Sequence, residues 1–439
     1  MQLFVGPYAD SGMNRMDSGC AIMVLVDGST VFAAASYATD TALLAELRAT
    51  WPPTDGAAGE RDGFRPTDLA ALDVVGAIRL TGRLAVALAI DGPSDGSFVV
   101  VPLVADEARW RRAMAGTGFS AFVAGVPLAS ERALGVDQTH DSVVVGEGAI
   151  VKWFRRVGPE PSRAAVVVAH LDAVGFAGLP APLGSLTWRS PAGEELTLAQ
   201  GDTFLPGARD GWEWCIQAVE NEFDPSLGAR LGRLTAELHA ALRTPSAVIP
   251  APIEWVGAAS LVEWRAVAID VLESAVAMTT ADAGEELRGY RPAMREGLDA
   301  LSTDRLVAIQ PTHGDFHVGQ VLEWSGGLAV IDFDGNPTLG SASNAIRQPV
   351  ERDIAQMLAS LDHVGRVVQA RADGDRGSAI DNWIADARRQ FLAAVGRVDE
   401  RLLVAFEIEQ ECRELIYSAR FLPRWTYAPM AALRARYAR

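Results

Sequence analysis

The residues with the clearest chemical potential lie in one segment, 313–334, which reads HGDFHVGQVLEWSGGLAVIDFD. Asp315 lies in a His-Gly-Asp turn, and Gln320 follows it after four intervening residues. The apolar stretch LAVI then leads to Asp332 and Asp334. Phosphoryl transfer needs a carboxylate that orients the acceptor hydroxyl and takes its proton, together with oxygen ligands for Mg²⁺. These residues, in this order, predict an ATP- and Mg²⁺-dependent phosphotransferase.

Each part of this segment has an ordinary structural interpretation when it is taken alone. A His-Gly-Asp triplet is usually a turn, and an Asp after an apolar strand is usually a strand end or a cap. The spacing from Asp315 to Gln320, however, matches the catalytic-loop pattern of an Asp, four residues and an amide. Combined with a strand that ends on Asp332, this pattern is far more specific than either part.

Length and composition set limits on the rest of the molecule. The 439 residues suggest two or three domains, and 49% hydrophobic with 22% charged residues indicate an ordinary globular protein. The net charge of −17 argues against broad binding to nucleic acid or to an anionic membrane, because both would repel it. A cationic small substrate would be tolerated well.

The cysteines and the N-terminus point to a reducing compartment. Cys20, Cys215 and Cys412 are far apart and form no CxxC pair, so neither a disulfide framework nor a zinc site is predicted. The first residues lack a basic region followed by an apolar one, and no apolar run approaches the roughly 20 residues of a membrane span. We therefore expect a cytoplasmic protein.

The predicted elements change in type along the chain. Up to about residue 205, apolar and β-branched runs with Asp-Gly or Gly-Glu-Gly turns favour strands, interrupted by one helix. Beyond that point apolar residues recur at helical spacing, apart from one β-rich island. Strands and hairpins are expected at 23–35, 85–92, 97–105, 141–154, 185–204 and 308–333, and helices at 163–175, 224–243, 258–301 and 350–420.

The whole pattern resembles a known family. HGDFHVGQVL and VIDFDGNP are similar to motifs of the aminoglycoside-phosphotransferase-like kinases and, among them, of the bacterial maltokinases. The segments 150–156, 196–214 and 231–242 extend this resemblance over nearly the whole chain. It implies an α+β, protein-kinase-like bilobal fold with an extra N-terminal β-rich cap. The expected domains are the cap (1–95), a β-rich lobe on the nucleotide side (96–205) and a helical C-lobe (206–439).

The resemblance also implies a role for each residue of the 313–334 segment. Asp315 would be the catalytic base. Gln320 and Asp332 would hold Mg²⁺, with Asp334 as an additional metal contact. ATP and Mg²⁺ are therefore the expected cofactors.

On the nucleotide side, the resemblance implies that Lys152 reaches the phosphates and that the backbone around Gln200 to Thr203 binds adenine. The stretch 138–142, which ends on Ser142, would replace a glycine-rich loop, since no GxGxxG is present there. One departure concerns the helix Glu that usually pairs with the strand lysine. No acid falls at its expected place in the stretch 160–164, although Glu160 could shift into the role.

The acceptor side is expected in segment 406–425, FEIEQECRELIYSARFLPRW, which aligns without gaps to a maltokinase segment. Maltokinases typically show Asp-Lys-Ala where this chain has Glu409-Gln410-Glu411, so a cation is lost and a carboxylate is gained. Glu407, Glu411 and Glu414 share one face of the predicted helix. This face is either a solvated, salt-bridged surface or a site for a positively charged sugar.

With this acidic replacement the chain resembles the actinobacterial-type glucosamine kinases, which are related to maltokinases. The resemblance implies transfer of the ATP γ-phosphate to the 6-hydroxyl of glucosamine. Carboxylates among Glu409, Glu411 and Glu414 would receive the ammonium group, and Arg420 would contact ring hydroxyls. Trp425 would offer an aromatic surface for the sugar, with a position in the core as the alternative.

Three other functions stay open on the sequence alone. A maltokinase forming maltose 1-phosphate is the nearest, and an aminoglycoside phosphotransferase would also need acids for a cationic acceptor. A nucleotide-binding pseudokinase is disfavoured because Asp315, Gln320 and Asp332 are all present. The expected partners are a small-molecule sugar and ATP, with no nucleic acid and no membrane. The sequence is silent on the oligomeric state.

Overall fold

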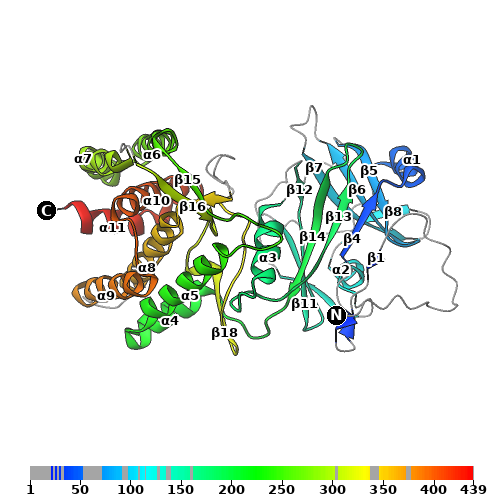
Figure 1. Cartoon of the computed structure of the whole chain (residues 1–439), viewed down its shortest axis with the longest axis horizontal. Coiled ribbons are helices and arrows are strands. Elements are labelled where there is room, and N and C mark those ends of the chain that lie inside the picture. The colour runs from blue at the N-terminus through cyan, green and yellow to red at the C-terminus, as the bar shows by residue number, and fades with distance from the viewer. Residues whose placement is uncertain are drawn as a thin grey trace. The chain divides into compact units, whose positions relative to one another are not determined.

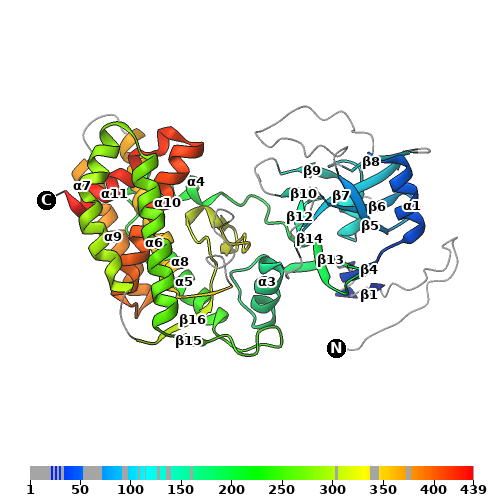
Figure 2. The same cartoon turned by 90° about the horizontal axis from the view of Figure 1, so that it is seen from above.

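The structure is a computed structural model, and it divides the chain into two compact units. The β-rich unit comprises residues 1–161 and 183–204, and the helical unit comprises residues 162–182 and 205–439. Figures 1 and 2 show the elements of both units. The residues described are 21–22, 25–26, 29–30, 34–52, 72–90, 97–106, 109–113, 115–125, 129–134, 140–158, 162–301, 305–336, 346–371 and 377–438.

The larger sheet of the β-rich unit has seven strands and carries the predicted nucleotide-side residues. β13 pairs with β4 in parallel, whereas β14, β11, β10 and β9 form the antiparallel part that includes the expected hairpin at 141–154. The strand order is β1 (Ala21–Ile22), β4 (Ala34–Ala38), β13 (Pro182–Arg189), β14 (Glu195–Thr203), β11 (Ala149–Trp153), β10 (Asp141–Val145) and β9 (Glu131–Ala133).

A second sheet has five strands: β12 (Arg156–Val157), β7 (Phe98–Asp106), β6 (Leu84–Ile90), β5 (Asp73–Arg79) and β8 (Arg109–Arg112). Phe98 and Trp188 bring the two sheets into contact through an edge-to-face ring pair with centroids 5.1 Å apart. Trp188 can approach closely because Gly76 faces it, where an added Cβ would lie 2.7 Å from the indole. Helices α1 (Thr41–Thr50) and α2 (Phe119–Val123) and the hairpin of β2 (Leu25–Val26) and β3 (Ser29–Thr30) complete this unit.

Among the described residues, the strands predicted from apolar and β-branched runs are confirmed with ends shifted by a few residues, whereas strands such as β5 and β8 were not predicted. The expected boundary at residue 95 falls between β6 and β7, and these two strands pair along most of their length. Residues on both sides of that boundary therefore share one sheet. The turn residues 27–28 and the stretch 91–96 lie outside the described residues.

The helical unit contains the predicted helices and the β-rich island. Its helices are α3 (Arg163–Ala173), α4 (Gly211–Glu222), α5 (Leu227–Leu242), α6 (Ala258–Met278), α7 (Ala281–Leu298), α8 (Glu351–Arg371), α9 (Gly377–Val395), α10 (Glu400–Phe421) and α11 (Tyr427–Tyr437), with short 3₁₀ turns η2 (Asp299–Leu301), η3 (Val318–Gln320) and η4 (Pro423–Trp425). Its strands are β15 (Glu254–Val256), β16 (Val307–Pro311) and β19 (Arg347–Gln348) in one sheet, and β17 (Val321–Trp324) and β18 (Gly327–Val330) in a hairpin.

Helix α8 lies at the centre of the helical unit, and its residues from Asp353 to Val368 are buried. It packs against α4, α9, α10 and α11, while α5 packs against α9. In Figure 2, α6, α7 and α10 lie side by side, in agreement with their contacts. A helix that is buried on every side can orient polar side chains with little freedom of movement. No helix among the described residues is long and apolar enough to cross a membrane.

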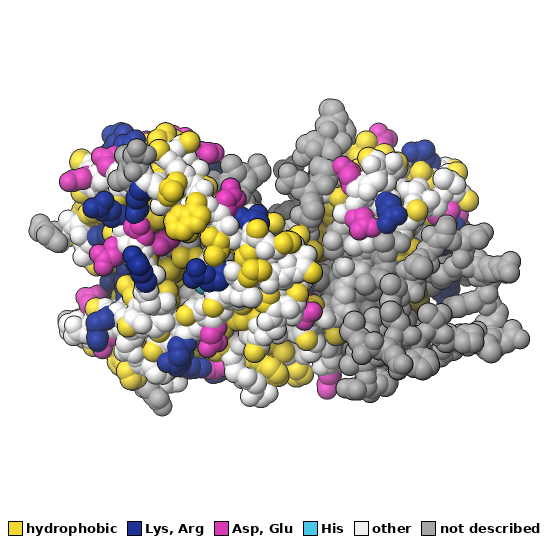
Figure 3. Space-filling model, viewed as in Figure 1, with side chains coloured by type: hydrophobic (Ala, Val, Ile, Leu, Met, Phe, Trp, Pro, Cys, Tyr) yellow, Lys and Arg dark blue, Asp and Glu magenta, His cyan; other side chains and the backbone are white. Residues whose placement is uncertain are grey.

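On the face of the helical unit shown in Figure 3, Lys and Arg side chains alternate with Asp and Glu side chains. Ion pairs also join helices of this unit, such as Arg434 with Glu286 and Arg295 with Glu273. Mixed charge of this kind is typical of a solvated surface and differs from the basic stripe of a nucleic-acid-binding face.

The contact between α5 and α9 depends on a glycine. A Cβ added to Gly228 would lie 2.1 Å from the carbonyl oxygen of Ala387, which belongs to the backbone of α9. We expect Gly228→Ala to lower the thermal midpoint, because overpacking of this kind costs about 1–3 kcal/mol. The matched control is Gly289→Ala in α7, where nothing lies within 4 Å of the new Cβ and helix propensity improves. Differential scanning fluorimetry that gave equal midpoints for the two variants would contradict this packing.

Candidate active site

The predicted base lies in a loop between β16 and η3, and the backbone there has an unusual conformation. Gly314 has φ 86°, and Asp332, at the end of β18, has φ 64°. Left-handed backbone suits glycine and is tolerated by Asp, and it recurs at functional sites. These two positions let the loop of Asp315 and the loop of Asp332 turn sharply toward each other, since Gly335 lies 3.3 Å from the place of a Gly314 Cβ.

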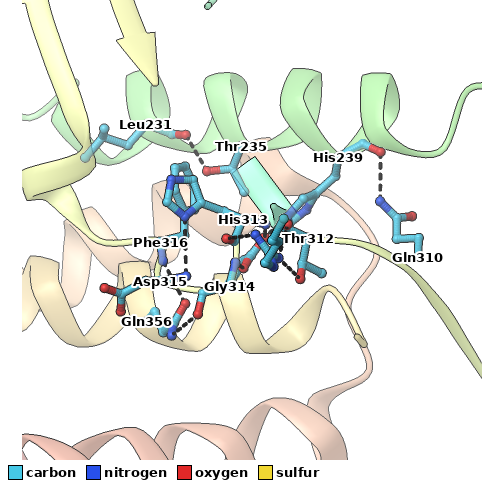
Figure 4. A network of polar contacts seen from close by, with 12 residues as sticks. Leu231, Thr235, His239, Gln310, Thr312, His313, Gly314, Asp315, Phe316 and Gln356 are labelled. Atoms are coloured by element: carbon cyan, nitrogen blue, oxygen red, sulfur yellow. Dashed lines mark hydrogen bonds and ion pairs between the residues drawn. The ribbon is translucent and has the colours of Figure 1, made fainter. Parts of the chain in front are cut away.

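Helix α8 holds the loop of Asp315 through polar side chains on one face. Figure 4 shows this loop between α5 and α8. The carboxylate of Asp353 accepts hydrogen bonds from the backbone N–H groups of His313 (2.8 Å) and Gly314 (2.9 Å). Gln356 accepts from the N–H of Phe316 (2.8 Å), and Ser360 accepts from that of Val318 (3.2 Å). A spacing of three and then four residues places these three side chains on one helix face.

Asp353 is fully buried, yet it stays ionised. Burial alone would raise its pKa, but hydrogen bonds from His239 (3.0 Å) and from the loop backbone outweigh this effect and lower the pKa. His239 belongs to α5, so the carboxylate joins α5, α8 and the loop. A buried charge is tolerated when it is paired and hydrogen-bonded in this way.

His313 links the loop of Asp315 to the strand end before Asp332. Its Nε2 lies 2.9 Å from the carbonyl oxygen of Ile331, and its Nδ1 accepts from the N–H of Asp315 at 3.3 Å. These contacts require the neutral ring with the proton on Nε2. Burial lowers the pKa of His313 to about 4, which agrees with this tautomer. The ring packs between Phe316 and Phe333.

The Asp315 carboxylate lies among groups that tune its basicity. Burial raises its pKa, and the negative charges of Asp332 and Glu414 raise it further. The side-chain N–H of Asn336 donates to its Oδ1 at 3.1 Å, and Nε2 of His317 lies 3.9 Å from its Oδ2. A raised pKa makes the carboxylate a better proton acceptor. Asn336 and His317 were not predicted, although both lie within or directly after the motif.

The predicted metal ligands belong to the same unit as this carboxylate, and the charge of Asp332 acts on it. Gln320 ends η3, and its Nε2 lies 3.4 Å from Nε2 of His317. Asp332 is exposed and Asp334 is partly buried. Among the described residues, no three His, Cys, Asp or Glu side chains are grouped as a metal site. Two carboxylates and an amide oxygen are nevertheless hard donors of the kind that Mg²⁺ takes, so the assignment of these ligands stays a prediction.

Three of the predicted nucleotide-side residues, Ser142, Lys152 and Gln200, lie on one face of the larger sheet, whereas Thr203 lies on the other face. Ser142 pairs with Lys152 across β10 and β11, and Lys152 pairs with Gln200 across β11 and β14. Thr203 pairs with Ala149 at the end of β14. Gln200 donates to the carboxylate of Asp202 at 3.1 Å, and burial raises the pKa of Asp202 to about 6. Residues 138–139 and Glu160 lie outside the described residues.

Of the acids in α10, most are already paired. Glu409 is 1% exposed and accepts from Arg352 (3.1 Å) and Arg413 (2.5 Å). Glu411 is buried and contacts His363 at 3.1 Å. Burial alone would lower the pKa of His363, but the carboxylates of Glu411, Glu414 and Asp362 raise it to about 9. Glu407 pairs with Arg388 and Arg436.

Glu414 differs from these acids in exposure and neighbours. It is partly exposed, and its oxygens accept from the indole N–H of Trp425 (3.0 Å) and from Gln410 (3.1 Å). The ring of Trp425 contacts that of Trp212, which in turn lies beside His317. A continuous set of aromatic rings therefore connects Glu414 to the neighbourhood of Asp315. Arg420 is exposed on the last turn of α10.

Trp425 was predicted either as a sugar-stacking surface or as a core residue. It is partly exposed and packs against the main core of the helical unit. The distant partners Arg388, Arg352 and His363 were not predicted, because no local pattern links them to Glu407, Glu409 and Glu411. Arg413, the second partner of Glu409, lies only four residues away on the same helix.

The neutral state of His313 predicts a pH dependence of stability. The unfolded chain takes up a proton as the pH falls below about 6.5, whereas the folded protein resists this down to about 4. The free energy of unfolding should therefore fall with acidification across this window, with an upper bound of about 3 kcal/mol from this residue. In His313→Gln, urea unfolding at pH 7 and pH 5 should show a smaller difference than in the wild type. Equal differences in the two proteins would exclude this assignment.

Comparisons with known proteins show the family to which the chain belongs. The glucosamine kinase of Streptacidiphilus jiangxiensis is 39% identical over 406 residues, covering 83% of this chain and 89% of that protein. The glucosamine kinase of Mycolicibacterium smegmatis is 36% identical over 324 residues, covering 70% and 79%. No protein-family model matches the chain.

Solved structures of a glucosamine kinase superpose over most of the chain. Crystal form B has a TM-score of 0.75 at 34% identity, covering 85% of this chain and 96% of that one. A complex with glucosamine, ADP and inorganic phosphate has a TM-score of 0.72 at 34% identity, covering 83% and 94%. The expected α+β, kinase-like fold is therefore confirmed, and the chain belongs to the glucosamine kinase family.

Proposed function

We propose that this protein transfers the γ-phosphoryl group of ATP to the 6-hydroxyl of glucosamine. The observation that carries the proposal is the partly exposed Glu414, whose negative charge acts on Asp315 in a chain of this family. A solved relative at 34% identity binds glucosamine, ADP and inorganic phosphate. A carboxylate linked to the neighbourhood of the base through Trp425, Trp212 and His317 suits an acceptor that carries an ammonium group.

Asp315 would accept the proton of the attacking hydroxyl. Its Oδ1 is held by Asn336, which leaves Oδ2 on the side of His317 for the substrate. The raised pKa of the carboxyl brings its basicity closer to that required at neutral pH. Asp353, His313 and Gln356 contribute by fixing the backbone on either side of this group.

Gln320, Asp332 and Asp334 would hold Mg²⁺, which would bridge the phosphate oxygens and neutralise their charge. The exposed Asp332 carboxylate and the Gln320 amide oxygen supply the hard donors. On the β-rich unit, Lys152 would contact the phosphates and Ser142 would lie beside it, while Gln200 and Thr203 would mark the strand that binds adenine.

For the acceptor, we assign the ammonium contact first to Glu414 and the ring contact to Trp425. Glu409 and Glu411 are already paired with Arg352 and His363. These two acids would therefore fix the position of α10 and would not contact the sugar directly. Arg420, at the exposed end of that helix, would contact ring hydroxyls. This arrangement offers one carboxylate, rather than the whole acidic face, to a single positive charge.

The acceptor assignment is tested by ATP turnover with glucosamine, glucose, N-acetylglucosamine, maltose and kanamycin. We expect glucosamine to give the highest kcat/KM, because only it combines a small sugar with an ammonium group. Asp315→Ala should abolish turnover while ATP binding remains. Turnover of maltose without turnover of glucosamine would overturn the proposal and favour a maltokinase.

The role of Glu414 is separated from that of Glu409 by their amide variants. Glu414→Gln should raise KM for glucosamine by about tenfold or more, with little change for a neutral sugar, because it removes a charge-assisted contact. Glu409→Gln should instead lower the thermal midpoint, since it leaves the partly buried Arg352 and Arg413 with a neutral partner. A glucosamine KM that rose in Glu409→Gln and not in Glu414→Gln would reverse the assignment.

A further inference from the structure

Arg163, the first residue of α3, connects three segments that are distant in the sequence. Its Nη1 donates to the carbonyl oxygens of His313 (2.6 Å) and Phe333 (2.7 Å). Its Nη2 donates to the carbonyl oxygen of Thr312 (2.5 Å). One guanidinium therefore ties α3 both to the loop that carries Asp315 and to the loop between Asp332 and Asp334.

We infer that Arg163 is a positioning residue that holds the carboxylate of Asp315 and the Asp332–Asp334 loop in one fixed arrangement. The inference rests on the proposed phosphoryl transfer for the meaning of that arrangement. Arg163 lies within the stretch 160–164, where the sequence lacks the acid that was expected to pair with Lys152.

The buried position of the Arg163 cation is expected to lower the free energy of unfolding rather than to raise it. It is 9% exposed, and it places a cation at a helix N-terminus, where the helix dipole favours anions. Its hydrogen-bond partners are neutral carbonyls, and burial lowers its pKa, although the nearby charges of Asp353, Asp334 and Asp315 act the other way. An apolar side chain of similar volume would avoid the desolvation of a charge. The guanidinium is distinguished by its planar fork of donors, which can span several acceptors at fixed angles.

The carbonyl groups bound by the Arg163 guanidinium lie close in sequence to the predicted base and metal ligands. His313 lies two residues before Asp315, and Phe333 lies between Asp332 and Asp334, so each carbonyl bound by Nη1 is close in sequence to a reacting group or a predicted metal ligand. The ring of His313 joins the same two loops by a second route, through the carbonyl of Ile331. With both links in place, neither loop can shift without breaking a buried hydrogen bond.

Gly314 supports the same interpretation. A Cβ at this position would lie 2.8 Å from Nη2 of Arg163, so the loop needs a glycine for the close approach of the guanidinium as well as for its φ of 86°. The guanidinium and the glycine are therefore matched parts of one contact.

The test uses Arg163→Lys, Arg163→Gln and Arg163→Ala in the full chain. Lysine keeps the charge but cannot span three carbonyls in fixed directions, so we expect kcat to fall about 100-fold, as for a displacement of about 1 Å at a reacting group. KM for glucosamine should change little, because Glu414 and Trp425 are untouched. The Mg²⁺ concentration for half-maximal rate should rise, since the Asp332–Asp334 loop is released.

A chemical rescue separates positioning from a general loss of stability. Guanidinium chloride at millimolar concentration, far below denaturing levels, should restore part of the kcat of Arg163→Ala, whereas sodium chloride and urea should not. If Arg163→Ala does not fold, the kcat and Mg²⁺ dependence of Arg163→Lys and Arg163→Gln decide the question.

The matched control is Arg388→Lys. Arg388 also donates to a backbone carbonyl, that of Leu358, and pairs with Glu407, but it does not contact the two loops. It should lose thermal stability while it keeps kcat. If the Arg163 variants behaved in the same way, with kcat per folded molecule unchanged, the inference would be overturned.

The test of Arg163 does not depend on which sugar accepts the phosphoryl group. If the wild type turned over a different sugar of the panel, the proposed acceptor would fail, and the Arg163 variants would be compared on the sugar that is used. A normal kcat and Mg²⁺ dependence in Arg163→Lys with an active wild type would refute the role of Arg163 alone.

Discussion

The helical unit depends on one buried carboxylate, that of Asp353. It is 0% exposed and receives two backbone N–H groups from the loop of Asp315 and one hydrogen bond from His239. Hydrogen bonds to an ionised acceptor are strong, and leaving one of these donors unpaired in the core would cost about 1–3 kcal/mol. The rest of the site follows from this anchor, because a loop pinned to a buried helix can hold a reactive group without ordering it anew in each cycle.

The carboxylate of Asp353 holds only the backbone N–H groups of the Asp315 loop. Other contacts of the loop are made by the cationic Arg163 and the neutral His313. Arg163 donates to the carbonyl oxygens of His313 and Thr312, and His313 joins the loop to the strand end at Ile331. Nearly every backbone group of the turn is therefore used, which agrees with the rule that buried polar groups are paired. The cation of Arg163 near three carboxylates also limits the net negative charge that would otherwise gather before any metal binds.

Much of this could be predicted from the sequence, and the reason why the rest could not is physical. The 313–334 segment is recognisable because its chemistry depends on spacing within one stretch, and the strands and helices followed from local periodicity. Asp353 and Gln356 gave no such signal, since polar residues within a long helix read as a solvated face and only the tertiary structure shows that α8 is buried. For Arg163, the sequence showed only that the stretch 160–164 lacks the expected acid, and it gave no sign of the role of the arginine. The domain boundary expected at residue 95 falls between two paired strands, because strand pairing, not composition, decides which residues share a sheet.

The acidic helix α10 shows how pairing decides which charge is available to a substrate. Its sequence has five glutamates between Glu400 and Glu414, which as free charges would repel one another. Three of these, Glu407, Glu409 and Glu411, are buried against Arg388, Arg352 and His363 on neighbouring helices and so fix the position of α10. Glu414 accepts from neutral donors instead, and among the described residues no cationic side chain forms a direct ion pair with it. An ammonium group next to Asp315 would complete the charge balance that the protein itself leaves open, which is why a cationic sugar is a better fit than a neutral one.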